Sequence, residues 1–137
     1  MALTFLIDTS VIKRLGQPTV REAVQPLAAA GEVARARITD LEVGYSARNE
    51  VEWDRLIAAL DAFEPLESTA SHHRRALQVQ RLLAQRSPRG RKIPDLLIAA
   101  AGEEHGLPVL HYDADFDLIS AVTGQACQWV VPAGTVD

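Results

Sequence analysis

Cysteine is nearly absent from the 137-residue sequence, which contains Cys127 and no other. An internal disulfide is therefore excluded, and the composition is compatible with a reducing compartment. The sequence also lacks any apolar run that approaches the roughly 20 residues of a membrane-spanning helix. Its first residues show no basic stretch followed by the apolar core of a secretion signal. We therefore expect a cytoplasmic protein with no membrane segment.

An excess of positive charge is missing as well. The chain has 14 basic and 18 acidic side chains, a formal net charge of −4, so its surface as a whole does not attract nucleic acid or anionic membranes. Gly-rich phosphate-binding motifs and the G-x-S-x-G turn are absent. The four histidines lack the spacing of a zinc site. Carboxylates remain as the main candidates for chemistry.

Hydrophobic residues account for 47% of the chain, which suits a single domain over residues 1–137. Short apolar runs typical of buried strands alternate with segments in which apolar residues have helical spacing. This alternation predicts an α/β fold with a central, mostly parallel sheet. Strands are expected at residues 3–7, 33–38, 63–67, 107–113 and 127–131. Helices are expected at residues 10–15, 18–31, 39–46, 49–63, 69–86, 93–106 and 114–122.

Some of these segments carry a more specific expectation. Pro26 lies inside the second predicted helix and should kink or divide it. Arg35 and Arg37 alternate with small or apolar residues, as expected for a strand with one solvated face. The helix at residues 93–106 is apolar around most of its circumference, so we expect it to be buried.

Four carboxylates, Asp8, Glu42, Asp95 and Asp113, lie where predicted strands end or predicted helices begin. Each has a purely local explanation. Asp8 and Asp95 stand at helix starts, where an aspartate caps the backbone N–H groups. The segment from Thr39 to Glu42 matches a capping box and, taken alone, favours that role for the glutamate. One of the acids around Asp113 is expected to cap the following helix.

Convergence is the alternative to four separate caps, because ligands bind beyond the carboxyl ends of the strands in open parallel sheets. Carboxylates gathered there repel one another, by about 4 kcal/mol for two charges ~4 Å apart at an effective dielectric constant of 20. A bound divalent cation relieves this repulsion. A ligand set of oxygen atoms without histidine or cysteine selects Mg²⁺ or Mn²⁺ over Zn²⁺.

The segments "LIDTSVI", "ITDLEVG" and "KIPDLLIAAAGEEHGLPVLHYDADFD" together resemble the PIN domain, and specifically the VapC-type toxins of bacterial type II toxin–antitoxin pairs. The resemblance covers nearly the whole chain. It implies a three-layer α/β/α sandwich and a Mg²⁺-dependent endoribonuclease, with Mn²⁺ as a substitute metal. It also implies a homodimer, an RNA substrate and a cognate VapB-type antitoxin.

The acidic set of the family falls on four residues of this sequence, which are the predicted catalytic residues Asp8, Glu42, Asp95 and Asp113. The resemblance makes Asp8, Asp95 and Asp113 metal ligands, with Asp115 as a further candidate. Whether Asp113 or Asp115 is the principal ligand stays open, because "DADFD" offers three acids. Thr9 and Ser10 match the family's hydroxyl positions and are expected to support Asp8 and its waters from a second layer.

The loop "RSPRGRK" provides Arg89, Arg91 and Lys92 just before Asp95, as candidate contacts to the RNA backbone. Its other interpretation is a solvated loop. Two further functions compete with the nuclease. One is a catalytically silent PIN-fold module that binds RNA or antitoxin without cutting. The other is a phosphatase with Asp8 as nucleophile, which is disfavoured because Ser10 stands where that class has a second aspartate.

Overall fold

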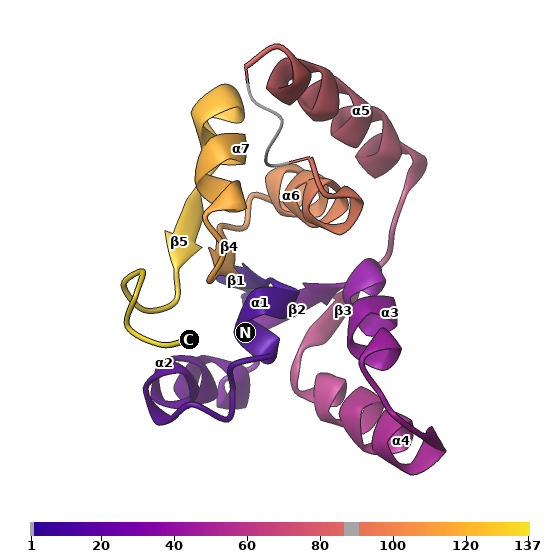
Figure 1. The fold of residues 1–137 in the computed structure, drawn as a ribbon, viewed down its shortest axis with the longest axis vertical. Coiled ribbons are helices and arrows are strands. Elements are labelled where there is room, and N and C mark those ends of the chain that lie inside the picture. The colour runs from indigo at the N-terminus through magenta and orange to yellow at the C-terminus, as the bar shows by residue number, and fades with distance from the viewer. Residues whose placement is uncertain (1, 87–90) are drawn as a thin grey trace.

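The computed structural model describes residues 2–86 and 91–137. Within these residues a parallel sheet with the strand order β3-β2-β1-β4-β5 is covered by helices on both faces (Figure 1). The strands are β1 (Phe5–Ile7), β2 (Val33–Ala36), β3 (Glu64–Leu66), β4 (Val109–His111) and β5 (Cys127–Trp129). The predicted α/β/α sandwich with a parallel sheet is confirmed.

The helices form the two outer layers, with α5, α6 and α7 on one face of the sheet and α2 and α4 on the other (Figure 1). Their bounds are α1 (Thr9–Ile12), α2 (Pro18–Ala29), α3 (Arg37–Tyr45), α4 (Glu50–Ala59), the 3₁₀ helix η1 (Leu60–Ala62), α5 (Ala70–Ala84), α6 (Ile93–His105) and α7 (Asp115–Thr123). None of the described helices is both long and apolar enough to cross a membrane.

The core consists of two apolar clusters separated by the sheet. Successive side chains of a strand point to opposite faces, so Leu6 joins the cluster beneath α5, α6 and α7 while Ile7 joins the cluster on the α2 side. Both faces of the central strands are therefore buried, which explains their continuous apolar runs. Residues 95–102 of α6 are all buried, which confirms the prediction for that helix.

The solvated strand face predicted for Arg35 and Arg37 is wrong. Strand β2 ends at Ala36, Arg37 begins α3, and Arg35 is buried with 6% of its surface exposed. The Arg35 guanidinium donates to Asp40 Oδ1 at 2.7 Å and to the carbonyl oxygens of Leu60, at 2.7 Å, and Phe63. Burial is tolerated because these acceptors replace water around the charge.

Pro26 does not divide α2, which continues to Ala29. Proline removes one backbone donor and leaves the carbonyl four residues earlier without its helical partner. That residue is Glu22, and both Glu22 and Pro26 are exposed. The missing hydrogen bond therefore falls on an exposed part of the helix, where its loss costs little, and the helix continues.

Substituting the buried arginine tests whether it joins β2 to the α3–η1 region. Arg35→Met should lower the free energy of unfolding by about 2–4 kcal/mol, because two buried carbonyl groups and Asp40 lose their donor. Arg37→Met removes an exposed partner of Glu67 and Asp40 and should lower the stability much less, because exposed ion pairs contribute little. Urea unfolding of both variants makes the comparison, and equal losses would contradict this role.

Candidate metal centre

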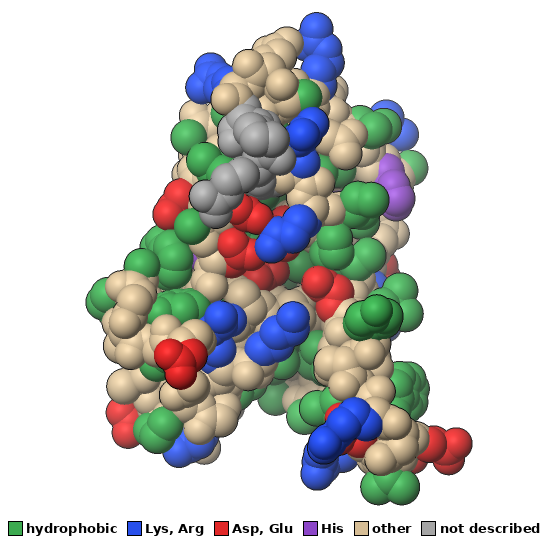
Figure 2. Space-filling view, in the orientation of Figure 1, with side chains coloured by type: hydrophobic (Ala, Val, Ile, Leu, Met, Phe, Trp, Pro, Cys, Tyr) green, Lys and Arg blue, Asp and Glu red, His purple; other side chains and the backbone are tan. Residues whose placement is uncertain are grey.

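One pocket of about 570 Å³ collects the predicted acids at the carboxyl edge of the sheet. Asp8 and Asp113 follow the neighbouring strands β1 and β4, Asp95 lies in the first turn of α6, and Glu42 comes from α3. Figure 2 shows acidic side chains gathered near the middle of this face, with basic side chains beside them. The lining residues are Asp8, Thr9, Ser10, Lys13, Arg14, Glu42, Lys92, Pro94, Asp95, Tyr112, Asp113 and Ala114.

The two carboxylate oxygens of Asp8 have different surroundings. Its Oδ2 accepts the backbone N–H of Ser10 at 3.0 Å, so the predicted helix cap is present. Its Oδ1 is buried and has no hydrogen-bond partner among the described residues. Burial raises the pKa of Asp8, and the hydrogen bonds from Ser10 oppose part of that shift. The cap therefore leaves one oxygen available for another ligand.

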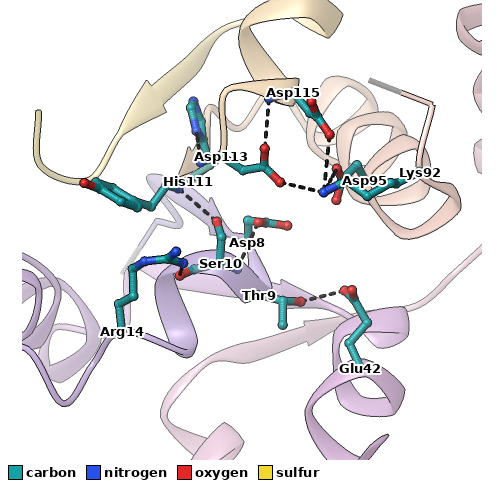
Figure 3. A network of polar contacts seen from close by, with 11 residues as sticks. Asp8, Thr9, Ser10, Arg14, Glu42, Lys92, Asp95, His111, Asp113 and Asp115 are labelled. Atoms are coloured by element: carbon teal, nitrogen blue, oxygen red, sulfur yellow. Dashed lines mark hydrogen bonds and ion pairs between the residues drawn. The ribbon is translucent and has the colours of Figure 1, made fainter. Parts of the chain in front are cut away.

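Glu42 does not form the predicted capping box. Helix α3 begins at Arg37, before Thr39, which is buried inside the helix and does not cap it. Glu42 Oε1 instead accepts a hydrogen bond of 2.6 Å from Thr9 Oγ1, the hydroxyl next to Asp8 (Figure 3). The carboxylate of Glu42 is therefore tied to the start of α1 and to the pocket.

The two hydroxyls predicted as a second layer connect different parts of the site. Thr9 holds Glu42. Ser10 contacts Asp8 through its backbone N–H, and its Oγ accepts the N–H of Tyr112 at 2.9 Å. These bonds join α1 to α3 on one side and to the end of β4 on the other.

Asp95 lies in the first turn of α6 after Pro94, while Lys92 is the residue at the cap position. Asp95 Oδ2 is buried without a hydrogen-bond partner among the described residues. Desolvation, followed by repulsion from Asp8, raises the pKa of Asp95 to about 8, although the positive charge of Lys92 acts in the opposite direction. A carboxyl that gains so little from local bonding is poorly explained as a cap.

Asp113 and Asp115 form a compact pair at the start of α7. Asp113 Oδ1 accepts the backbone N–H of Asp115 at 2.9 Å. Burial raises the pKa of Asp113, but this hydrogen bond and the contact with Lys92 outweigh it and lower the pKa. One oxygen each of Asp95, Asp113 and Asp115 lies within 4.8 Å of the others. Asp113 and Asp115, between which the sequence did not decide, therefore each contribute an oxygen to the same group.

Lys92 extends into this group of oxygens (Figure 3). Its Nζ lies 3.1 Å from Asp113 Oδ2, 3.3 Å from Asp115 Oδ2 and 3.8 Å from Asp95 Oδ2. Partial burial lowers the pKa of Lys92, but the carboxylates outweigh it and raise the pKa above its usual value. Among the other predicted RNA contacts, Arg91 is exposed and Arg89 lies outside the described residues.

Residues that the sequence reasoning missed line the opposite side of the pocket. They are Lys13, Arg14 and Tyr112. Arg14 donates to the backbone oxygens of Ser10, at 2.8 Å, and Asp137, at 2.6 Å, and its guanidinium lies 4.8 Å from the centre of the Tyr112 ring. The signal available in the sequence was two adjacent basic residues within two turns of Asp8.

His111 supports the site from below without lining it. The ring is fully buried against Phe116 and Trp129, and Nδ1 accepts the backbone N–H of Asp113 at 3.2 Å. Desolvation lowers the pKa of His111, so the neutral ring is favoured. Its contribution is to hold the backbone of Asp113 in place.

The donors in this pocket fit a hard divalent cation. All are carboxylate oxygens, and two of them, Asp8 Oδ1 and Asp95 Oδ2, are buried without hydrogen bonds from the described residues. A cation would supply the missing partner and reduce the repulsion between the charges. Such an ion, held over an open pocket at the carboxyl edge of a parallel sheet, can activate water and bind a phosphate group. Fold and site together define a metal-dependent hydrolase of phosphodiesters.

Comparison with known proteins agrees with this class. Residues 5–122 match the PIN domain family. The chain is 79% identical to Ribonuclease VapC51 of Mycobacterium tuberculosis H37Rv over the full length of both proteins. It is 42% identical to Ribonuclease VapC21 of the same organism, over 98% of this chain and 99% of the relative. The chain therefore belongs to the PIN domain family and, within it, to the VapC-type ribonucleases.

Solved structures show the same fold at low sequence identity. A DNA-bound VapBC from Salmonella typhimurium has a TM-score of 0.71 and 20% identity, and the match covers 94% of this chain and 99% of that one. VapBC2 from Rickettsia felis, bound to a promoter DNA fragment, has a TM-score of 0.72 and 18% identity over 93% of this chain and 98% of that one.

The raised pKa of Asp95 has a consequence for stability. Between the pKa of the unfolded chain, about 4, and the folded value of about 8, the folded state binds more protons. The stability contributed by this group is therefore lost as the pH rises towards 8. In metal-free protein, Asp95→Asn should raise the free energy of unfolding relative to wild type by about 1–2 kcal/mol at pH 8.5 and by much less at pH 5.5.

Asp113→Asn is the matched control, because the pKa of Asp113 is lowered and its ionised form stabilises the fold. This variant should lose stability at pH 8.5. Urea unfolding in EDTA at the two pH values measures both effects. A difference between Asp95→Asn and wild type that does not grow with pH would contradict the assignment.

Proposed function

We propose that this VapC-type ribonuclease is the toxin of a type II toxin–antitoxin pair and hydrolyses RNA in the cytoplasm with Mg²⁺, for which Mn²⁺ substitutes. The proposal covers residues 1–137 as one catalytic domain. The observation that carries it is the pair of buried oxygens, Asp8 Oδ1 and Asp95 Oδ2, which lack hydrogen-bond partners among the described residues and line the same pocket. Oxygen ligands alone favour Mg²⁺ or Mn²⁺.

The ligands in this proposal are Asp8, Asp95 and Asp113, with Asp115 completing the set on the α7 side. An ion held by these residues would supply a more acidic water molecule and a positive charge opposite the scissile phosphate. Glu42 orients the attacking water, and Thr9 holds Glu42 by a hydrogen bond to its Oε1. Attack by water on phosphorus, with departure of the ribose 3′-oxygen, leaves a 5′-phosphate and a 3′-hydroxyl.

Basic side chains around the pocket are proposed to hold the RNA backbone, because the carboxylates alone repel phosphate. Lys13 and Arg14 line the pocket on the side of α1. Arg14 is fixed by its bonds to Ser10 and Asp137, whereas no hydrogen bond or ion pair of the Lys13 side chain appears among the described residues. Arg91 and Arg89 remain predicted contacts on the side of α6.

A VapB-type antitoxin and a second copy of the chain are proposed as protein partners. The structural relatives include VapBC assemblies and a toxin–antitoxin complex from Klebsiella pneumoniae. Next to the acidic pocket, a shallow pocket of about 300 Å³ is lined largely by Ile38, Leu41, Tyr45 and Pro94. Leu41 and Tyr45 are exposed, and exposed apolar groups of this kind are typical of protein contacts.

Cleavage of structured RNA tests the catalytic proposal. Purified protein should cut with Mg²⁺ and not with EDTA, and Asp8→Asn and Asp95→Asn should each lower the rate by about 100-fold or more, since each removes a metal ligand. Asp54→Asn, in the exposed helix α4, is the control and should keep the wild-type rate. Cleavage by the Asp8 and Asp95 variants at the wild-type rate would refute the proposal. Growth inhibition that survives both substitutions would favour the silent binding module.

RNA affinity tests the basic contacts separately from cleavage. In the Asp8→Asn background, Lys13→Gln and Arg91→Gln should weaken binding to unrelated RNA sequences by similar factors. Each should also reduce the slope of log affinity against log salt by about 0.7, the value for one lost phosphate contact on a single strand. Arg55→Gln, on the exposed face of α4, is the control. Fluorescence anisotropy at several salt concentrations supplies the slopes, and unchanged slopes would remove both residues from the interface.

A further inference from the structure

We infer that Lys92 is a built-in counter-ion that occupies the cation position of the metal-free centre and must leave when a metal ion binds. The inference rests on the proposed function and concerns the regulation of the same site. The Nζ atom contacts one oxygen each of Asp113, Asp115 and Asp95, at 3.1, 3.3 and 3.8 Å. These three residues supply the oxygens that lie within 4.8 Å of one another and fit a cation.

The two cations cannot share this position. A Mg²⁺ ion binds its oxygen ligands at about 2.1 Å, so an ion held by these three carboxylates would lie close to the ammonium group. Two positive charges in that space repel each other. The tethered ammonium therefore competes with the metal. It also neutralises part of the repulsion between the carboxylates when no metal is bound.

Lys92 can be displaced without disturbing the core. Its side chain is 61% exposed and enters the acidic group from the solvent side. Lys92 stands at the cap position of α6, just outside the helix, and Pro94 follows in the first turn. The backbone is therefore held by the helix, while the long, largely exposed side chain can turn towards solvent without moving it. Arg35, in contrast, is buried and satisfied by backbone acceptors.

Lys13 separates this inference from a general effect of positive charge. It lines the same pocket and carries the same charge. No ion pair or side-chain hydrogen bond of Lys13 is found in the described parts of the chain. Removing either lysine lowers the positive charge around the site by one, but only removal of Lys92 vacates the position between the three oxygens.

The experiment measures binding of Mn²⁺ by calorimetry to wild type, Lys92→Met and Lys13→Met. A pH of 8.5 is used, so that protons compete less with the metal. Lys92→Met should bind Mn²⁺ about tenfold more tightly than wild type, because several partly exposed ion pairs no longer have to be broken. Lys13→Met should change the affinity by less than about threefold, as expected for a screened charge nearby.

The inference would be overturned if Lys92→Met bound Mn²⁺ with the same affinity as wild type, or if Lys92→Met and Lys13→Met gained the same affinity. Either result would leave the metal centre in place. No binding by wild type or by Lys92→Met would overturn the inference together with the proposed function. If Lys92→Met does not fold, acetylation of the wild-type protein, followed by mass spectrometry, decides. Addition of Mg²⁺ should increase the acetylation rate of Lys92 and not that of Lys13, and an unchanged ratio would overturn the inference.

Discussion

The repulsion between carboxylates at one edge of the sheet is the constraint on which the rest of the structure depends. Asp8 and Asp113 follow β1 and β4, Asp95 lies in α6, and each of these elements is fixed by the core rather than by contacts among the acids. The backbone N–H of Asp8 donates to Leu110 and extends the β1–β4 ladder up to the site. The sheet thereby holds in place charges that would separate in a flexible chain, which is the arrangement a cation needs.

The surrounding polar residues keep this edge in register. Thr9 ties α3 to α1, and Ser10 ties α1 to the end of β4. Arg35 joins β2 to the start of α3 and to the residues that follow α4. His111 orients the backbone of Asp113. These bonds hold the segments that carry the acids in fixed relative positions.

Strand ends and helix starts were predictable because the apolar runs are short and end in acids or turn residues. That logic singled out Asp8, Glu42, Asp95 and Asp113, and resemblance to the PIN domain favoured a shared catalytic role for them over four separate caps. Local pattern failed at Thr39, since a capping box requires the helix to begin there and α3 begins at Arg37. It also failed at Arg35, whose acceptors Leu60 and Phe63 are distant in sequence. The direction of the Lys92 side chain depends on tertiary structure and has no sequence signal.

The pairing of β1 with β4 has a consequence for the synthesis of the protein. Asp8 is made early, but β4, which pairs with β1, and Asp113, which completes the acidic pocket, follow about a hundred residues later. A ribosome that stops before β4 therefore releases a fragment that has some of the acids but lacks the complete centre. A truncated product of this kind cannot assemble the cutting site beside the messenger RNA from which it is being translated.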